Sequence, residues 1–320
     1  SPYWSERYGL LKPTNKEFKW VEFYEAVAEK LLTYANNRKP LVDAVNEIAI
    51  RQGLNYLQDK FESGLKDSLT DICPFTTMGM SNRSMTIPNR RAIAGDLASF
   101  LGIDIPVPDN FDGVPVLNNQ RSWFFRHASD RGEHDIDNLW EVFVAANQMI
   151  KNDQSTTREF FLQAFDNAIK QWGVAWNLST GLYWAHPWEF PTLDKRSRLY
   201  IKIRLGLKIV PALRLRSCNA ESYLKLTEEL ESLFVREDTP VHSFPALSFK
   251  ALDTLKEEPL DDFDDAYPQP DNQPNINDSV IDATNSVPLA TVMPYGVDDV
   301  LKEGCFLESQ EITYFIERLK

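Results

Sequence analysis

The sequence predicts a mostly α-helical fold, α-rich within the α+β class, with only short extended segments. Three observations support this prediction. Several segments repeat apolar residues at helical spacing, prolines and glycines stand at the ends of these segments, and runs with strand-like alternation are short. The chain has 320 residues, of which 43% are hydrophobic and 25% charged, and this length suits about two domains.

The helical stripe is clearest in five segments, which are residues 17–37, 88–101, 137–150, 156–172 and 219–235. In the fourth segment, Thr156 and Glu159 form a predicted capping box, the stripe runs to Trp172, and Gly173 follows. The second segment begins with a proline and is followed by Gly102, which are the preferred places of these residues at helix ends.

Residues 111–125 are expected to form short extended pieces. Asp112-Gly113 and Asn118-Asn119 are turn signals, and short apolar runs lie beside them. This segment is the minor extended component of an otherwise helical body.

The chain is predicted to have three parts. Residues 1–252 form a helical recognition module. Residues 253–293 form an acidic linker, rich in proline and asparagine, that has too little apolar surface to offset its ordering entropy. Residues 294–320 contain a helix whose apolar stripe has nothing further to bury it; the stripe is Ile312, Phe315, Ile316 and Leu319.

The net charge of −13 is concentrated in the C-terminal part. Residues 1–250 contain 30 Lys and Arg against 31 Asp and Glu, whereas residues 251–320 contain 4 against 16. The body is therefore nearly neutral, and local basic clusters leave nucleic-acid binding open.

The sequence predicts a cytoplasmic protein. It has no apolar run long enough to span a membrane and no apolar signal core near its N-terminus. Its three cysteines, Cys73, Cys218 and Cys305, are far apart and odd in number. A disulfide framework or zinc site is therefore not expected, and a reducing compartment is the simple interpretation.

The strongest charge feature is the run KRSRLYIKIRLGLKIVPALRLR at 195–216, which contains eight cations and no acid. Such cations bind phosphate groups. Asp194 and Gly206 suit the two ends of a helix, but the alternation over 199–210 is strand periodicity, so both conformations remain open. We predict DNA binding by this run, with help from three arginines near the start of the 88–101 helix. The predicted residues are Lys195, Arg196, Arg198, Lys202, Arg204, Lys208, Arg83, Arg90 and Arg91.

Aromatic residues are dense just before this run, in WNLSTGLYWAHPWEFPTLD at 176–194. Most are expected to be core side chains. Aromatics beside cations also suit base stacking, and we predict base contacts for Tyr183, Trp184 and Trp188.

No catalytic or metal-binding motif is evident in the sequence. His127, Asp130, His134, Asp135 and Asp137 form a loose list of metal-ligand types, but their spacing matches no known site, and no metal is expected. No nucleophile elbow, HExxH motif or phosphate-binding loop occurs.

The segment VDDVLKEGCFLESQEITYFIERLK at 297–320 resembles the lead-in to the nucleotide-binding domain of McrB-family AAA+ proteins, the motor subunits of modification-dependent restriction systems. The body also resembles the N-terminal region of some of these proteins. The similar stretches are DICPFTTMG (71–79), FDGVPVLNNQRSWFF (111–125), DIDNLWEVF (135–143) and parts of 176–198.

The resemblance implies a parent protein that is a GTP- or ATP-driven motor using Mg²⁺ in anti-phage defence. It also implies a hexameric ring formed through the AAA+ domain, a McrC-like nuclease subunit as partner, and an N-terminal region that selects DNA, including modified DNA. The sequence given stops before any phosphate-binding loop, so these residues are expected to hold no cofactor and to catalyse no reaction themselves.

Two other functions remain open. The nearly neutral body suits a module that senses a protein or assembles the ring, with the aromatic residues forming a partner surface. An enzyme that acts on a base would need an acid beside the aromatic cluster, and the nearby acids are Glu189 and Asp194. Asp194 also suits a helix cap.

Overall fold

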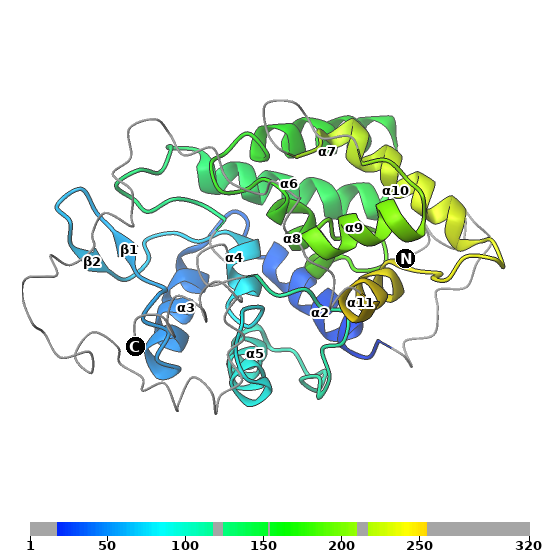
Figure 1. The fold of residues 1–320 in the computed structure, drawn as a ribbon. Coiled ribbons are helices and arrows are strands. Elements are labelled where there is room, and N and C mark those ends of the chain that lie inside the picture. Colours follow the sequence, from blue (N-terminus) through cyan, green and yellow to red (C-terminus); the bar gives the residue numbers. More distant parts are fainter. Residues whose placement is uncertain (1–17, 118–123, 153, 210–216, 255–320) are drawn as a thin grey trace, which may run out of the picture.

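The computed structural model describes residues 18–117, 124–152, 154–209 and 217–254 (Figure 1). Within these ranges the fold is mostly α, as predicted. Its helices are α2 (Trp20–Leu32), α3 (Lys39–Arg51), α4 (Pro74–Gly79), α5 (Ile87–Leu101), α6 (Asp135–Lys151), α7 (Ser155–Ala168), α8 (Asn177–Ala185), α9 (Lys195–Arg204), α10 (Ala220–Phe234) and α11 (Phe244–Thr254). The described strands, β1 (Asp59–Lys60) and β2 (Lys66–Asp67), form a small antiparallel hairpin.

The described helices form two groups. In Figure 1, α6, α7 and α10 lie together on the upper side, and α2, α3 and α5 lie on the lower side. α7 packs on α6 and α10 in the upper group, whereas α2 and α3 pack on α5 in the lower group. α4 contacts α2, α6 and α8, so it joins the two groups. One continuous apolar cluster extends from Phe18 to Ala251, and both groups therefore share a single core.

Helix α8 lies at the centre of this core, because all of its residues are buried. A helix that is surrounded on all sides has no polar face, so its sequence lacks the amphipathic stripe that predicts a helix. Gly181 allows α4 to approach closely, since a Cβ atom at this position would lie 2.6 Å from Cδ1 of Phe75. Besides α8, the sequence did not predict α3, α4 or α11.

Helices α5 and α10 confirm the predictions at 88–101 and 219–235 to within one residue. The Thr86 side chain caps the start of α5, and Gly102 ends it with φ 65°, the left-handed conformation that glycine adopts readily. Asn219 caps α10. Because these signals are local, they could be recognised without knowing what the helices pack against.

Three other predicted helices exist with different bounds. α2 is shorter than the predicted 17–37, and α6 extends slightly beyond the predicted 137–150. The start of α7 is capped differently from the prediction of Thr156 and Glu159, which was wrong. The backbone N–H of Gln154 donates a hydrogen bond to the hydroxyl of Thr157 at 3.1 Å, so the capping pair lies two residues earlier.

The end of α7 also differs from the prediction. The helix ends at Ala168 rather than continuing to residue 172. Gly173, with φ 84°, belongs to the turn that follows. Trp172 was predicted to lie on the buried stripe, but it is 47% exposed because the chain has already left the helix.

The described parts of 111–125, which are residues 111–117 and 124–125, contain no regular strand. The extended component predicted there is limited to an isolated parallel bridge between Leu117 and Arg83. The turn at Asp112-Gly113 is confirmed. Gly113 has φ 82°, and the N–H of Val114 donates to the carbonyl of Phe111 at 3.0 Å. The turn signal at Asn118-Asn119 lies outside the described residues.

Two further predictions also fall outside the described residues. They are the acidic linker at 253–293, of which only the first two residues are described, and the helix predicted within 294–320. These parts of the chain stay as predictions from the sequence.

Candidate nucleic-acid interface

The basic run after Asp194 is a helix as far as Arg204, so the helical alternative is the correct one for this part. The Asp194 carboxylate caps it, accepting hydrogen bonds from the backbone N–H groups of Arg196 (3.0 Å) and Ser197 (3.2 Å) and from the hydroxyl of Ser197 (2.7 Å). Gly206 follows the helix with φ 70°. Capping at both ends thus outweighs the strand-like alternation of the sequence.

Of the cations in this run that the structure describes, five lie at the surface. Lys202, Arg204 and Lys208 are exposed, and Lys195 and Arg196 are partly exposed. Within the part of the chain that the structure describes, Lys195, Arg196, Arg204 and Lys208 form no ion pair with a carboxylate. We call these five residues the α9 basic surface.

The middle of α9 packs into the core and against α11, since Ser197, Arg198, Leu199, Tyr200 and Ile201 are all buried. Arg198 is among them, because its guanidinium donates to the carbonyl of Leu193 at 2.7 Å and lies 4.4 Å from the ring centroid of Trp176. Arg198 was predicted to bind DNA, but this position places its charge in the core.

The three arginines near α5 do not form an exposed cluster, so the predicted help from them is not found. Arg83 and Arg90 are only 2% and 5% exposed. Arg83 lies 3.1 Å from the ring centroid of Tyr56, and burial lowers the pKa of Arg83 to about 10 and raises that of Tyr56 to about 12. Arg91 is exposed but pairs with Asp109 at 2.8 Å.

The three aromatic residues predicted to contact a base are core side chains. Tyr183 and Trp184 are 0% exposed and Trp188 is 1% exposed. Tyr183 donates its hydroxyl to the carbonyl of Gly113 at 2.8 Å, and Trp184 donates its indole N–H to the carbonyl of Pro115 at 3.0 Å. A base could reach these rings only if the core opened, so the prediction was wrong for all three.

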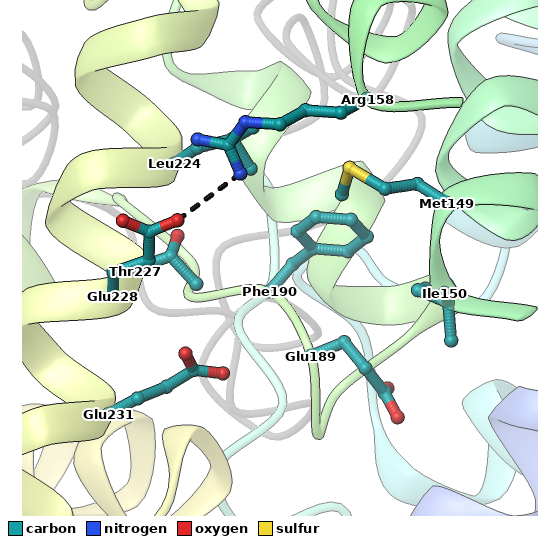
Figure 2. Close-up of a pocket in the computed structure, with 9 residues that line it drawn as sticks. All are labelled: Met149, Ile150, Arg158, Glu189, Phe190, Leu224, Thr227, Glu228 and Glu231. Atoms are coloured by element: carbon teal, nitrogen blue, oxygen red, sulfur yellow. Dashed lines mark hydrogen bonds and ion pairs between the residues drawn. The ribbon is translucent and has the colours of Figure 1, made fainter. Parts of the chain in front are cut away.

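A small pocket lies between α6, α7 and α10, and Glu189 lines it (Figure 2). Arg158 of α7 and Glu228 of α10 form an ion pair at 3.2 Å beside it, and Glu231 is a second buried carboxylate in its wall. The pocket has room for about one water molecule. A nucleobase does not fit there. Glu189 therefore has no room for a base in this pocket, and the carboxylate of Asp194 is engaged as the cap of α9.

Several of the histidine and aspartate side chains at 127–137 make structural contacts within the protein. Asp137 pairs with Arg38 at 2.6 Å, and Asp135 accepts the backbone N–H of Gly132 at 3.0 Å. His127 lies 3.6 Å from Asp59, a buried carboxylate that sequence reasoning did not single out. Among the described residues, no three His, Cys, Asp or Glu side chains are grouped so that they could hold a metal ion.

The described residues form a mostly helical module with surface cations at the two ends of α9 and just beyond it. Residues 20–254 match the family described as "Domain of unknown function (DUF8425)", and because this match covers more than half of the chain, the protein belongs to that family. No curated protein and no solved structure matches the chain. None of the helices in the described ranges combines the length and apolar character needed to cross a bilayer.

Proposed function

We propose that this module binds DNA through the α9 basic surface. The observation that supports the proposal is the concentration of surface cations at one helix. Residues 195–208 contain no acid, and four of the five surface cations form no ion pair with a carboxylate in the described part of the chain. Phosphate groups would supply the missing negative charge, and the release of their counterions would favour binding.

The position of these cations along α9 also favours a binding role. Lys195 and Arg196 stand in the first turn, where the helix dipole disfavours positive charge. The Asp194 cap offsets part of this cost. Residues that destabilise the helix in which they lie are typical of functional sites rather than of structural ones.

The resemblance of the sequence to McrB-family proteins suggests the setting in which the module acts. We propose that it selects DNA in the cytoplasm for a GTP- or ATP-driven motor that uses Mg²⁺, and that this motor forms a hexameric ring with a McrC-like nuclease. The buried free thiols of Cys73 and Cys218 are compatible with a reducing compartment. In this setting the motor and the ring belong to an AAA+ domain outside the described residues.

Charge reversal tests the DNA-binding proposal. We expect the triple variant Lys195→Glu, Arg204→Glu, Lys208→Glu to bind a short mixed-sequence DNA duplex at least about tenfold more weakly than the unchanged protein at about 50 mM salt. Fluorescence anisotropy of the labelled duplex measures the affinity. The three side chains lie at the surface, so the fold should be retained, and circular dichroism checks this.

A matched control distinguishes the effect of the α9 basic surface from the effect of the total charge of the protein. The variant Lys30→Glu, Lys60→Glu, Lys66→Glu changes the net charge equally, but on α2 and the hairpin, where all three lysines are exposed. We expect its affinity for the duplex to remain within about threefold of that of the unchanged protein. Equal loss of binding in both variants would contradict an α9 site, and no binding by the unchanged protein would contradict the proposal as a whole.

One observation favours the alternative of a protein-sensing or assembly module. Ile203 is 50% exposed and lies between the exposed Lys202 and Arg204. An apolar side chain among cations suits an acidic protein partner better than a phosphate backbone. A pull-down tests this alternative. It is favoured if protein partners remain bound to the chain after nuclease treatment and if Ile203→Glu abolishes their binding.

A further inference from the structure

The C-terminal end of α9 and the residues just beyond it form a continuous part of the surface, since residues 202–209 are all at least partly exposed. This part contains Lys202, Arg204 and Lys208 of the α9 basic surface, and Ile203 stands among them with 50% exposure. Arg204 and Lys208 form no ion pair with a carboxylate in the described part of the chain. Cations around an apolar side chain suit an acidic protein segment that also carries apolar residues.

The chain itself contains such a segment shortly after α11. Residues 257–265 read EEPLDDFDD, with six acids and no Lys or Arg, and they include the large apolar residues Leu260 and Phe263. Six of the 16 acids of residues 251–320 therefore lie in these nine positions. The negative charge of the C-terminal part is thus concentrated just after the last described helix.

Helix α11 brings the start of this segment close to α9. The two helices pack on each other, with Cα atoms within 8 Å (Figure 1). Each helix is only about 15 Å long, so every residue of α9 lies within roughly 35–40 Å of Thr254, where α11 ends. Residues 255–265 span up to about the same distance when extended, so the last acids of the segment can reach α9 in any orientation of the two helices.

A tethered segment needs little affinity to occupy a nearby surface. Linking two groups through a short stretch of chain gives an effective concentration on the order of 1 mM. A contact that would dissociate at this concentration is therefore half occupied within one molecule. Several exposed ion pairs, each weak by itself, can supply this affinity, and salt weakens them by screening.

We propose that residues 257–265 dock on the C-terminal end of the α9 basic surface when no DNA is bound, and that they compete there with DNA. Their carboxylates pair with the cations of residues 202–208, and Leu260 or Phe263 covers Ile203. The docking is inferred from charge, exposure and reach, whereas the competition rests on the proposed DNA binding. The acidic segment thereby lowers the affinity of the module for DNA, since only molecules with a free surface bind it.

Chemical cross-linking of the unchanged protein tests the docking. A carbodiimide joins a lysine to a carboxylate in direct contact with it, and mass spectrometry of the monomeric product identifies the pair. At about 50 mM salt we expect Lys202 and Lys208 to be joined to residues 257–265, with a yield at least about threefold lower at about 0.5 M salt. The exposed lysines of α2 and the hairpin should give at least about tenfold less of this product; they are Lys30, Lys60 and Lys66.

Neutralising the segment tests the competition. One variant replaces its six acids by amides, which are Glu257→Gln, Glu258→Gln, Asp261→Asn, Asp262→Asn, Asp264→Asn and Asp265→Asn. We expect it to bind the labelled duplex at least about fivefold more tightly than the unchanged protein at about 50 mM salt. The control removes six acids further along the chain and should change the affinity by less than about twofold; its changes are Asp271→Asn, Asp278→Asn, Asp282→Asn, Asp298→Asn, Asp299→Asn and Glu303→Gln.

The outcomes separate the docking from the proposed DNA binding. If residues 257–265 are joined to the control lysines as readily as to Lys202 and Lys208, the docking is wrong, whatever the affinity for DNA. If the cross-links form as expected but neither the unchanged nor the neutralised protein binds DNA, the docking stands and the DNA-binding proposal fails. If DNA binds through the α9 basic surface but both amide variants change its affinity equally, the segment acts only through the total charge, and the competition is wrong.

Discussion

At the scale of single residues, close packing around α8 sets how the two helix groups meet. Gly181 faces Phe75, whose side chain is fully buried and contacts the rings of Phe124 and Phe143. A Cβ atom at 181 would lie 2.6 Å from Cδ1 and 3.2 Å from Cβ of Phe75. The ring cannot yield without disturbing its neighbours, so this contact requires glycine.

We therefore expect Gly181→Ala to lower the free energy of unfolding by about 1–3 kcal/mol, the usual cost of overpacking a core. The matched control is Gly95→Ala in α5, where the added Cβ would lie at an ordinary 3.7 Å from Cγ2 of Val107. There the better helix propensity of alanine should stabilise the protein by about 0.5–1 kcal/mol. Urea unfolding of both variants gives the two signs, and a neutral Gly181→Ala would mean that Phe75 has room to move.

Residue identity alone did not predict which candidate side chains reach solvent. The sequence located the cations of α9 correctly as a group, since a run without acids is visible in any conformation. It could not separate Arg198 from Arg196, because only the packing of α9 on the core decides which of them turns inward. For the same reason Trp184 was predicted as a site and is core, whereas Trp172 was predicted as core and is exposed.

At the scale of elements, the buried carboxylate of Asp59 connects the β1–β2 hairpin to the rest of the fold. The carboxylate of Asp59 in β1 is fully buried and accepts hydrogen bonds from the backbone N–H of Ala128 at 2.6 Å and from Arg131 at 3.0 Å. Burial alone would raise the pKa of Asp59. The neighbouring His127, the hydrogen bond from Ala128, and the charge and hydrogen bond of Arg131 together outweigh it, so the pKa is lowered.

This lowered pKa predicts how acid acts on the hairpin. A carboxyl group with a lower pKa in the folded state stabilises the fold above its unfolded pKa of about 3.9, and the contribution is lost as pH falls through the folded pKa. We expect Asp59→Asn to cost about 3 kcal/mol at neutral pH, since it leaves Arg131 without its charge partner. The variant should also lose stability less steeply than the unchanged protein below about pH 4.

The control for this prediction lies directly across the hairpin. Asp67 pairs with Asp59 in the strand register but is exposed. Asp67→Asn should therefore change the free energy of unfolding by less than about 0.5 kcal/mol. Chemical unfolding measured from neutral to acidic pH tests both variants, and identical pH profiles for Asp59→Asn and the unchanged protein would contradict a stabilising role for this carboxylate.

The elements that sequence predicted well are those with strong local signals. α5 and α10 each have a capping side chain and an apolar stripe, and both were placed to within one residue. The sequence did not predict α8, because a helix that is buried on every side has no amphipathic stripe. In α9 the local signals conflicted, and the Asp194 cap decided the outcome.

At the scale of the whole molecule, the charge is unevenly distributed. The net charge is −13, yet residues 1–250 hold 30 Lys and Arg against 31 Asp and Glu. An overall acidic chain is repelled by DNA at long range, and this repulsion is screened beyond about 10 Å in moderate salt. The proposed DNA binding therefore depends on local contacts of the α9 basic surface rather than on the field of the whole protein.

The number of cations in the α9 basic surface determines the expected salt dependence of the proposed DNA binding. Each cation that neutralises a duplex phosphate contributes about −0.9 to the slope of log K against log salt concentration. The five cations of the α9 basic surface thus account for a slope of about −4 or −5 with duplex DNA. For Lys195→Glu, Arg204→Glu, Lys208→Glu the slope should be smaller in magnitude by up to about 3. Anisotropy titrations over a series of salt concentrations measure these slopes.

A much steeper slope would place additional phosphate contacts elsewhere on the protein, and a slope near zero would mean that DNA does not bind through the α9 cations.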